Sequence, residues 1–528
     1  MGLGVVSAVA PHAVIWPAPD YGKVAASVRD LFRFLGLDAA NPLGRWIRPG
    51  MTVVVKPNWV KHEFGPTVGR NVLFTHASLV RVLLDAALEA LAGRGRVLVA
   101  DAPLQGCDFA RFRRQSGLAE MERDYACSPV AFLDLRRQWA EIDDASSYVR
   151  GVHPLAGDPQ GYSMVDLGAR SRLVCFGVNA RFGVTDYNAE RSQSPHCYPV
   201  GNTVLSADVI LNVPKLKTHM KTGMTGALKN FVGITGAKDF LPHFRAGSPS
   251  AGGDEYPDRN WLSYAASPVR KHLQTRAPLW LWKLARAGAQ AASSPLIHGG
   301  GWHGNDTLWR TIHDLVDIAR NYDVGGAPRP QPRTILTLVD AIVAGEDCGP
   351  LKPRPKPCGL LIWGEDPGMV DVTCATLMGF DWRRIPLLSH LCDVEAQAFT
   401  DFRGEANCRY QHGLRVVGQR HHADIRDAVS VLGSQYAHPL LCQNAEPALT
   451  LARTEFENHQ RLQAAMPMFA HVPLHKFPVH VLHIRTVGSP QILFDWDTGR
   501  RHAHKSTPSG PPLSPLPSPP ARRMGPCW

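Results

Sequence analysis

Short apolar runs alternate with amphipathic patterns along the first part of the chain. Ala13–Trp16 and Thr52–Lys56 are apolar and β-branched, and Val24–Leu35 and Ser78–Leu91 carry apolar residues at helical spacing. A further run, Arg96–Ala100, begins the next unit. Strands that alternate with helices predict an α/β fold with a mostly parallel sheet and helices on both faces. The other predicted strands are Val130–Leu133, Leu173–Phe176, Val209–Val213, Thr334–Val339 and Gly359–Trp363.

Two regions interrupt this alternation. Residues 240–305 contain a stretch rich in Gly, Ser, Pro and Asp, which predicts an insertion or lid-like segment because such long connections are usually functional or disordered. The α/β core is therefore predicted in two parts, 1–239 and 306–390. Residues 391–528 lose regular periodicity and are expected to form an irregular C-terminal extension, poorly ordered from about residue 506, where Pro and Ser dominate. A translated frameshift is equally compatible with this pattern.

The segment Val209–Asn230, V-I-L-N-V-P-K-L-K-T-H-M-K-T-G-M-T-G-A-L-K-N, changes from apolar to basic. Its first residues predict a buried strand that Pro214 ends, because proline lacks the N–H donor of a strand. The next basic residues alternate with Leu, Thr and Met, so Lys215, Lys217 and His219 would share one face of an extended segment. This pattern predicts a concentrated positive surface.

The second half of the same segment favours binding of an anion. Gly223 and Gly226 let backbone N–H groups approach a ligand closely, and the helical turn predicted after them points its N-terminus to the same place. The basic side chains have no acidic neighbours in the sequence and would repel one another unless an anion were bound. A solvated surface loop is the alternative. The predicted substrate-binding residues are Lys56, Asn58, Lys215, Lys217, Lys229 and Asn230.

Polar residues follow several predicted strands, at the ends where open parallel sheets bind ligands. Lys56, Asp101 and Asp340 each follow a strand, and Asp371 lies in the first turns of a later helix, so we expect them to converge on one rim. The candidate catalytic residues are His219, Asp340 and Asp371; the reference pKa of His219, about 6.5, suits a general acid or base. A structural histidine is the alternative. Asp340, Glu346 and Asp371 offer hard oxygen ligands for Mg²⁺ bridging a phosphate.

The composition of the chain restricts which kinds of ligand and partner it is expected to bind. The net charge of +11 and pI near 9.2 indicate acidic partners, but zinc-finger spacing, RNP-like aromatic blocks and a single lysine-rich face are missing, so small anions rank above nucleic acid. The eleven cysteines include no C-x-x-C pair, which disfavours an intrinsic iron–sulfur cluster and favours reduced thiols in a cytoplasmic protein. No apolar run reaches the length of a transmembrane segment; Trp280 and Trp282, beside Lys283, suggest peripheral membrane contact as a minor alternative.

Four blocks of the sequence resemble a known family. They are V-V-V-K-P-N at 53–58, the basic segment N-V-P-K-L-K-T-H-M-K-T-G-M-T-G-A-L-K-N-F-V-G, V-D-A-I-V-A-G-E at 339–346, and D-P-G-M-V-D at 366–371. Together they resemble the domain-of-unknown-function 362 (DUF362) family, over roughly residues 12 to 390. The resemblance implies little about the reaction. Many relatives are fused to a ferredoxin-like module with clustered cysteines, which this chain does not share.

Three functions follow as hypotheses. The first is an enzyme that binds an anionic small molecule, with a divalent metal as a further option. The second, implied by the resemblance, is a redox protein that receives electrons from a separate ferredoxin-like, iron–sulfur partner. The third is a non-catalytic binding or scaffold protein. Hydrolase, P-loop kinase and zincin classes are disfavoured, because their sequence motifs do not occur.

Overall fold

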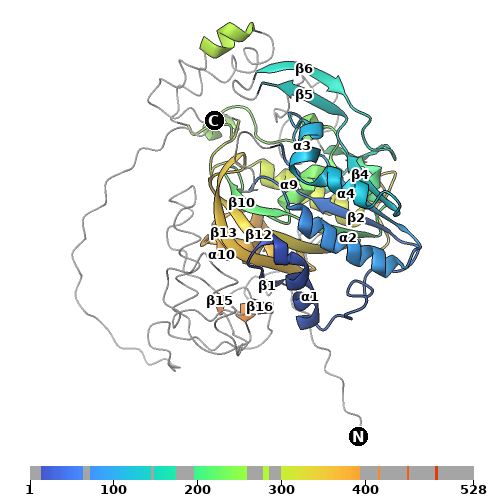
Figure 1. The fold of residues 1–528 in the computed structure, drawn as a ribbon. Helices are drawn as coiled ribbons and strands as arrows, with labels where there is room; N and C mark the ends of the chain where they lie inside the picture. The colour runs from blue at the N-terminus through green and yellow to red at the C-terminus, as the bar shows by residue number, and fades with distance from the viewer. Residues whose placement is uncertain are drawn as a thin grey trace, which may run out of the picture.

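A computed structural model describes residues 13–62, 72–143, 148–173, 196–258, 277–284 and 299–392, together with three short strands at 414–416, 449–450 and 482–485. All but the first residue of the predicted strand Leu173–Phe176, and the predicted tail from residue 506, lie outside these ranges. The predicted α/β architecture with a mostly parallel sheet is confirmed (Figure 1).

One large sheet organises the described residues, with the order β15-β14-β16-β1-β13-β12-β9-β2-β3-β4 and β10 and β11 attached beside β12. From β12 through β9, β2 and β3 to β4 neighbouring strands run parallel, whereas β13 runs antiparallel to both β12 and β1. The strands are β1 (Ala13–Pro17), β2 (Thr52–Pro57), β3 (Arg96–Asp101), β4 (Val130–Asp134), β9 (Val209–Val213), β10 (Lys215–His219), β11 (Gly223–Thr225), β12 (Thr334–Cys348), β13 (Lys352–Gly364), β14 (Leu414–Val416), β15 (Leu449–Thr450) and β16 (Leu482–Arg485).

Both faces of this sheet are apolar, because successive side chains along each central strand pack alternately into two hydrophobic cores. Val53, Val55 and Leu211 point to one core, while Val54 and Ile210 point to the other. The first core lies under α1 and α2, which Figure 1 shows on one face, and the second lies under α9 and α10. The helices are α1 (Val24–Phe34), α2 (Ala77–Leu91), α3 (Phe109–Gln115), α4 (Leu118–Asp124), α6 (Asn202–Leu205), α9 (Leu308–Asn321), α10 (Pro367–Leu377) and α11 (Pro386–Ser389).

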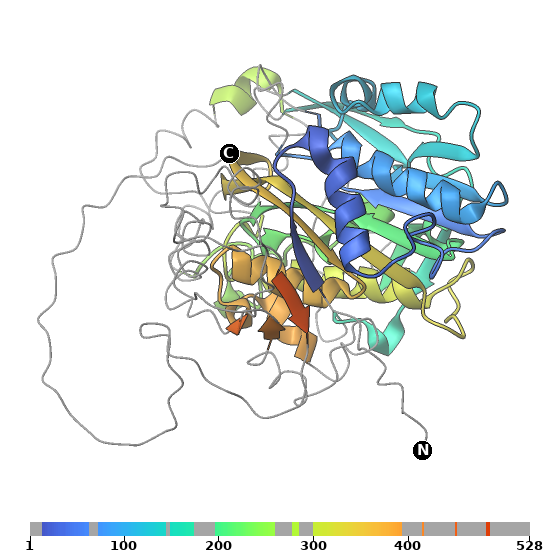
Figure 2. The ribbon, with the colours of Figure 1, turned by 60° about the horizontal axis from the view of Figure 1, so that its bottom comes forward.

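Smaller elements surround the sheet. β5 (Gln138–Ile142) pairs with β6 (Val149–Pro154), and β7 (Tyr162–Asp166) pairs with β8 (Cys197–Gly201). Within the C-terminal extension, which was expected to be irregular, β16 pairs antiparallel with β1 and widens the main sheet; it is the red strand of Figure 2. Within the described residues, no helix has the length and apolar character that crossing a membrane requires.

Candidate functional site

The basic segment follows β9, a strand in the interior of the sheet. The N–H of Asp340 donates to the carbonyl of Pro214 at 2.8 Å, which guides the chain into β10 alongside β12. The basic segment therefore begins as the short strand β10, and the chain then turns back and pairs with it as the antiparallel strand β11. Lys215 and Lys217 alternate with Leu216, which packs in the apolar core, so the extended pattern predicted for this segment is present.

Lys215 forms a buried ion pair with Asp340. Its Nζ lies 3.0 Å from Asp340 Oδ2 and 2.7 Å from the hydroxyl of Tyr21, which itself donates to Asp340 Oδ1 at 3.1 Å. The N–H of His76 donates to Asp340 at 3.0 Å, and the imidazole of His76 stacks on Tyr21. Burial and then Asp340 raise the pKa of Tyr21 well above its ordinary value. Asp340 thus neutralises the first lysine of the segment.

Lys56 is also paired in the interior. Its Nζ lies 2.6 Å from Asp101, whose other oxygen accepts from the N–H of Trp59 at 2.7 Å. The amide of Asn230 donates to the carbonyl of Lys56 at 3.0 Å and to Asn212 at 2.8 Å. Burial lowers the pKa of Lys56, and the Asp101 carboxylate opposes that shift. This network joins three neighbouring strands to the end of the basic segment.

Asp371 holds the turn that closes the basic segment. The N–H groups of Ala227 and Leu228 donate to its two carboxylate oxygens at 2.6 and 3.0 Å. The carboxylate lies where an anion was predicted, because backbone donors at a helical turn attract negative charge. Burial raises the pKa of Asp371 to about 7, against the two backbone donors, which lower it.

Two lysines of the site lack a carboxylate partner within the described chain. Lys217 is almost fully buried, and its Nζ donates to the carbonyl of Leu73 at 2.5 Å. The side chain of Lys229 makes neither a hydrogen bond nor an ion pair with another described residue. Burial, then Lys229 and Lys215, lower the pKa of Lys217 well below its ordinary value; burial and then Lys56 lower the pKa of Lys229 to about 8. These are the cations that an anion would stabilise.

Two neutral histidines lie beside these lysines, and we call Lys217, Lys229, His219 and His243 together the cationic cluster. Burial is the largest cause that lowers the pKa of both imidazoles, followed by Lys229 at His219 and by Lys221 at His243. The Nδ1 of His219 accepts from the N–H of Lys221 at 3.1 Å. A neutral His219 therefore carries its proton on Nε2, where it can donate to a ligand.

A cavity of about 230 Å³ adjoins His219. Lys221 and the exposed Arg384 contribute positive charge to its lining, and Trp302 and Phe380 contribute aromatic surface. His303 also lines this cavity. A mixed lining of this kind, mostly apolar with a few polar groups, is typical of small-molecule sites.

Each of the three carboxylates proposed to bind magnesium has its own partners elsewhere in the protein. Asp340 binds Lys215, Asp371 binds backbone N–H groups, and Glu346 pairs with Arg354 at 3.0 Å and with Lys356 at 3.5 Å. Across the described ranges, three or more His, Cys, Asp or Glu side chains nowhere form a group that could hold a metal ion. The described carboxylates therefore do not fit a shared metal cage. The magnesium site stays a prediction.

The structure thus brings most of the predicted residues together. Asp340 contacts the start of the basic segment, Asp371 contacts its end, and Lys56 contacts Asn230, which confirms the predicted convergence on one rim. Asn58 contributes through its backbone, which exchanges hydrogen bonds with Thr75. Whether these residues bind a substrate stays a prediction.

Several residues at the site were missed. Tyr21 follows β1 and His76 precedes α2, so both lie at the same sheet end as the predicted residues, and the strand-end rule would have included Tyr21. His243 lies in the predicted lid, where glycine and proline dominate the pattern. Arg384 follows α10 and carries no motif of its own.

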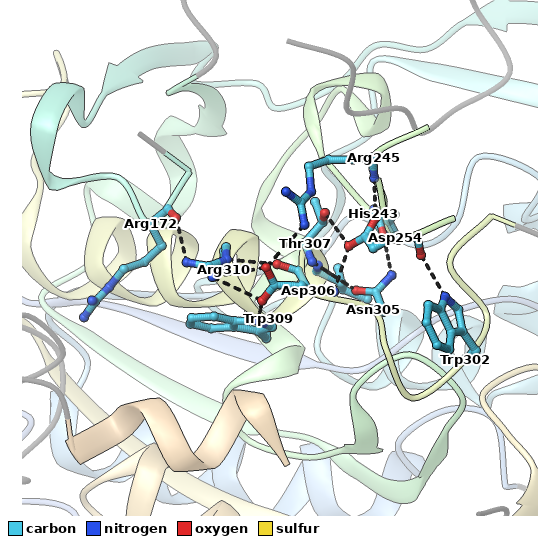
Figure 3. Close-up of polar contacts among 11 residues, drawn as sticks. Arg172, His243, Arg245, Asp254, Trp302, Asn305, Asp306, Thr307, Trp309 and Arg310 are labelled. Carbon is cyan, nitrogen blue, oxygen red and sulfur yellow. Dashed lines mark hydrogen bonds and ion pairs between the residues drawn. The ribbon is translucent and has the colours of Figure 1, made fainter. Parts of the chain in front are cut away.

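Two polar residues connect the end of the predicted lid region to α9. Asn305 precedes α9, and its Oδ1 accepts from the N–H groups of Leu308 at 2.9 Å and Thr307 at 3.3 Å. Asp306 pairs with Arg245 at 3.3 Å and Arg310 at 3.1 Å (Figure 3). Because α9 begins at Leu308, its N-cap residue is Thr307, whose side chain makes no capping hydrogen bond.

The peripheral-membrane residues differ in exposure. Trp280 is 66% exposed, whereas Trp282 is buried, so only one of the two indoles is available to a surface. Membrane contact through them remains an untested prediction.

Comparisons with known proteins identify a family over part of the chain. Residues 160–376 match the model of the family described as "Domain of unknown function (DUF362)". A crystal structure of a protein from Thermotoga maritima resembles the chain with 13% sequence identity and a TM-score of 0.27, over 68% of this chain. The chain spans 59% of the length of that protein. No curated protein matches the sequence.

Proposed function

We propose that this chain, which carries a DUF362 domain over residues 160–376, binds a phosphate- or carboxylate-bearing small molecule at the carboxyl ends of its parallel strands. The observation that carries the proposal is the pair Lys217 and Lys229, which have no carboxylate partner in the described chain. In contrast, the neighbouring Lys56 and Lys215 each have their own buried aspartate.

Electrostatics favours a ligand over an empty cluster. Like charges in a partly buried site repel one another by an amount on the order of a few kcal/mol, and burial adds to the cost of each charge. A bound dianion offsets both costs and raises the pKa of the lysines again. A salt-bridged structural site would place Asp or Glu beside the lysines, as happens at Lys56 and Lys215.

The test is a thermal-shift and calorimetric screen of sugar phosphates, nucleotides and organic acids against the wild type, Lys217→Ala and Lys229→Ala. A charge-assisted hydrogen bond contributes about 1.5–3 kcal/mol, so each substitution should weaken binding roughly tenfold to a hundredfold. Arg29→Ala removes an exposed arginine on α1 and is the control. Equal affinities of all four proteins for every hit would remove the cluster from the binding site.

The other hypotheses are outcomes of related measurements. Repeating the screen with magnesium tests whether a cation bridges the ligand to Asp340, Glu346 or Asp371. Electron transfer from a separate ferredoxin-like partner would identify a redox protein. If no small anion binds, a non-catalytic scaffold role gains support. Catalytic roles for His219, Asp340 and Asp371, and a cytoplasmic location, remain part of the proposal.

A further inference from the structure

The cavity beside the cationic cluster has a wall suited to an apolar, planar group. Trp302, Phe380, Ile385 and Met220 line it, together with Lys221 and Arg384. Its volume of about 230 Å³ exceeds the ~150 Å³ of a protein cavity that takes up benzene, and lies below the ~300–1,000 Å³ of sites for drug-sized ligands. One aromatic ring with a small substituent matches this size, whereas a whole nucleotide does not.

The indole of Trp302 is held in place on this wall. Its Nε1 donates to the carbonyl of Asp254 at 2.8 Å, and its ring lies so close to Gly304 that a Cβ there would be 2.2 Å from the ring (Figure 3). The Asp254 carboxylate accepts from the N–H groups of Arg245 at 2.5 Å and Asp306 at 2.7 Å.

A second set of bonds fixes the loop that carries this indole. The amide of Asn305 donates to the carbonyls of His243 at 2.7 Å and Gly300 at 3.1 Å (Figure 3). His243 belongs to the cationic cluster, so the loop that presents the aromatic wall is bonded directly to the cluster that would hold the anion. A planar surface fixed before binding loses little conformational entropy when a ring stacks on it.

We infer that the ligand is a small aryl anion, such as an aryl phosphate or aryl carboxylate. Its anionic group lies toward His219 and Lys229, and its ring lies in the cavity against Trp302 and Phe380. This inference rests on the proposed function, because it assigns the anion to the same cluster. The new element is that the cavity selects ligands by the aromatic ring that carries the anionic group.

The test compares phenyl phosphate with methyl phosphate, two monoesters with the same charged group, by calorimetry on the full chain. The phenyl ring buries apolar surface and stacks on an aromatic side chain, which methyl phosphate cannot do, so phenyl phosphate should bind the wild type at least ~10-fold more tightly. Trp302→Leu should reduce this preference to less than about threefold, whereas Trp302→Phe should retain most of it because a ring remains.

Lys229→Ala separates this inference from the proposed function. It should weaken both esters by a similar factor and leave their ratio unchanged. If neither ester binds, or if Lys229→Ala binds both as the wild type does, the proposed function fails and the inference fails with it. Equal wild-type affinities for the two esters, or an unchanged preference in folded Trp302→Leu, overturn the aryl inference alone. The wild-type ratio decides the matter even if Trp302→Leu does not fold.

Discussion

A Cβ atom on residue 226 would lie 2.0 Å from the Oδ1 of Asp371, so Gly226 is the residue that allows this carboxylate to reach the backbone of the basic segment. From that position Asp371 accepts from the N–H groups of Ala227 and Leu228. The glycine was predicted to admit a ligand; within the described structure it admits a carboxylate from α10. The Asp371 carboxylate thus fixes the turn that leads to Lys229 of the cationic cluster.

Gly226→Ala should therefore destabilise the protein. The added methyl group displaces Asp371 and weakens two hydrogen bonds to a charged acceptor, each contributing about 1.5–3 kcal/mol, so we expect a loss of roughly 3 kcal/mol or more. Urea unfolding measures it. Gly36→Ala is the control, because no atom lies within 4 Å of the added Cβ and only the strain of φ +69° remains, about 1–2 kcal/mol. Equal losses in the two variants would contradict this account of Gly226.

Arg333 links the C-terminal ends of two helices, and its guanidinium bonds to backbone carbonyls there instead of to a carboxylate. Its buried guanidinium donates to the carbonyls of Ala207 and Leu205 at 2.6 Å, to Tyr322 at 3.0 Å and to Ala319. Leu205 ends α6 and Ala207 follows it, while Ala319 lies in the last turn of α9 and Tyr322 follows it; helix ends of this kind leave acceptors unpaired.

Arg333→Leu should cost about 3 kcal/mol or more, because it leaves four buried acceptors without their donor. Arg333→Lys should recover part of this loss, since an ammonium group donates fewer bonds in a different geometry. Chemical denaturation of both variants, with Arg29→Ala as the surface control, measures the difference. A loss for Arg333→Leu no larger than that of the control would show that the guanidinium contributes nothing to stability.

The sequence predicts the central strands well because burial on both faces leaves long apolar runs, as in Val53–Val55 and Val209–Val213. It also predicts which strand ends converge, because parallel strands share one ligand-binding edge. The predicted strand Gly359–Trp363 is too short. β13 starts at Lys352, in a stretch whose prolines give no strand signal.

Those prolines are tolerated because they alternate. Pro353, Pro355 and Pro357 face the same direction along β13, and β1 pairs with β13 only beyond them, at residues 360–363. Beside residues 353–357 the described sheet pairs β13 with β12 alone, so these prolines lie in an edge segment, where proline is tolerated.

The sequence also could not predict which residues contact the residues of the site. Asp371 binds residues more than 140 positions away, and such contacts follow from packing, which no local pattern encodes.

Lys56 and Asp101 form a pair whose loss should be asymmetric. Lys56→Met leaves a buried aspartate with only the N–H of Trp59, and breaking a buried pair in this way costs about 3–5 kcal/mol. The double variant Lys56→Met/Asp101→Asn should recover about 2 kcal/mol or more, because the amide oxygen still accepts from Trp59 and no charge remains. A double-mutant cycle in urea measures the coupling. Strictly additive losses would show that the two residues do not interact.

Lys229 should make anion binding depend on pH. Its pKa of about 8, lowered by burial and by Lys56, means that the lysine loses its charge as pH rises through 8, whereas in the unfolded chain it does so at about 10.5. The folded state binds fewer protons between these values, so the stability of the free protein rises with pH from about 8 to 10.5, while affinity for phosphate falls.

Calorimetry of phosphate-ester binding between about pH 7 and 9.5 tests the second part. The affinity should fall above pH 8 by up to about tenfold per pH unit, the limit for one proton taken up on binding. Lys229→Arg keeps its charge over this range, so it should bind with a nearly flat profile. Lys217→Ala, which keeps Lys229, should bind more weakly and retain the decline. A wild-type affinity that is constant from pH 7 to 9.5 would mean that Lys229 does not supply the charge that holds the anion.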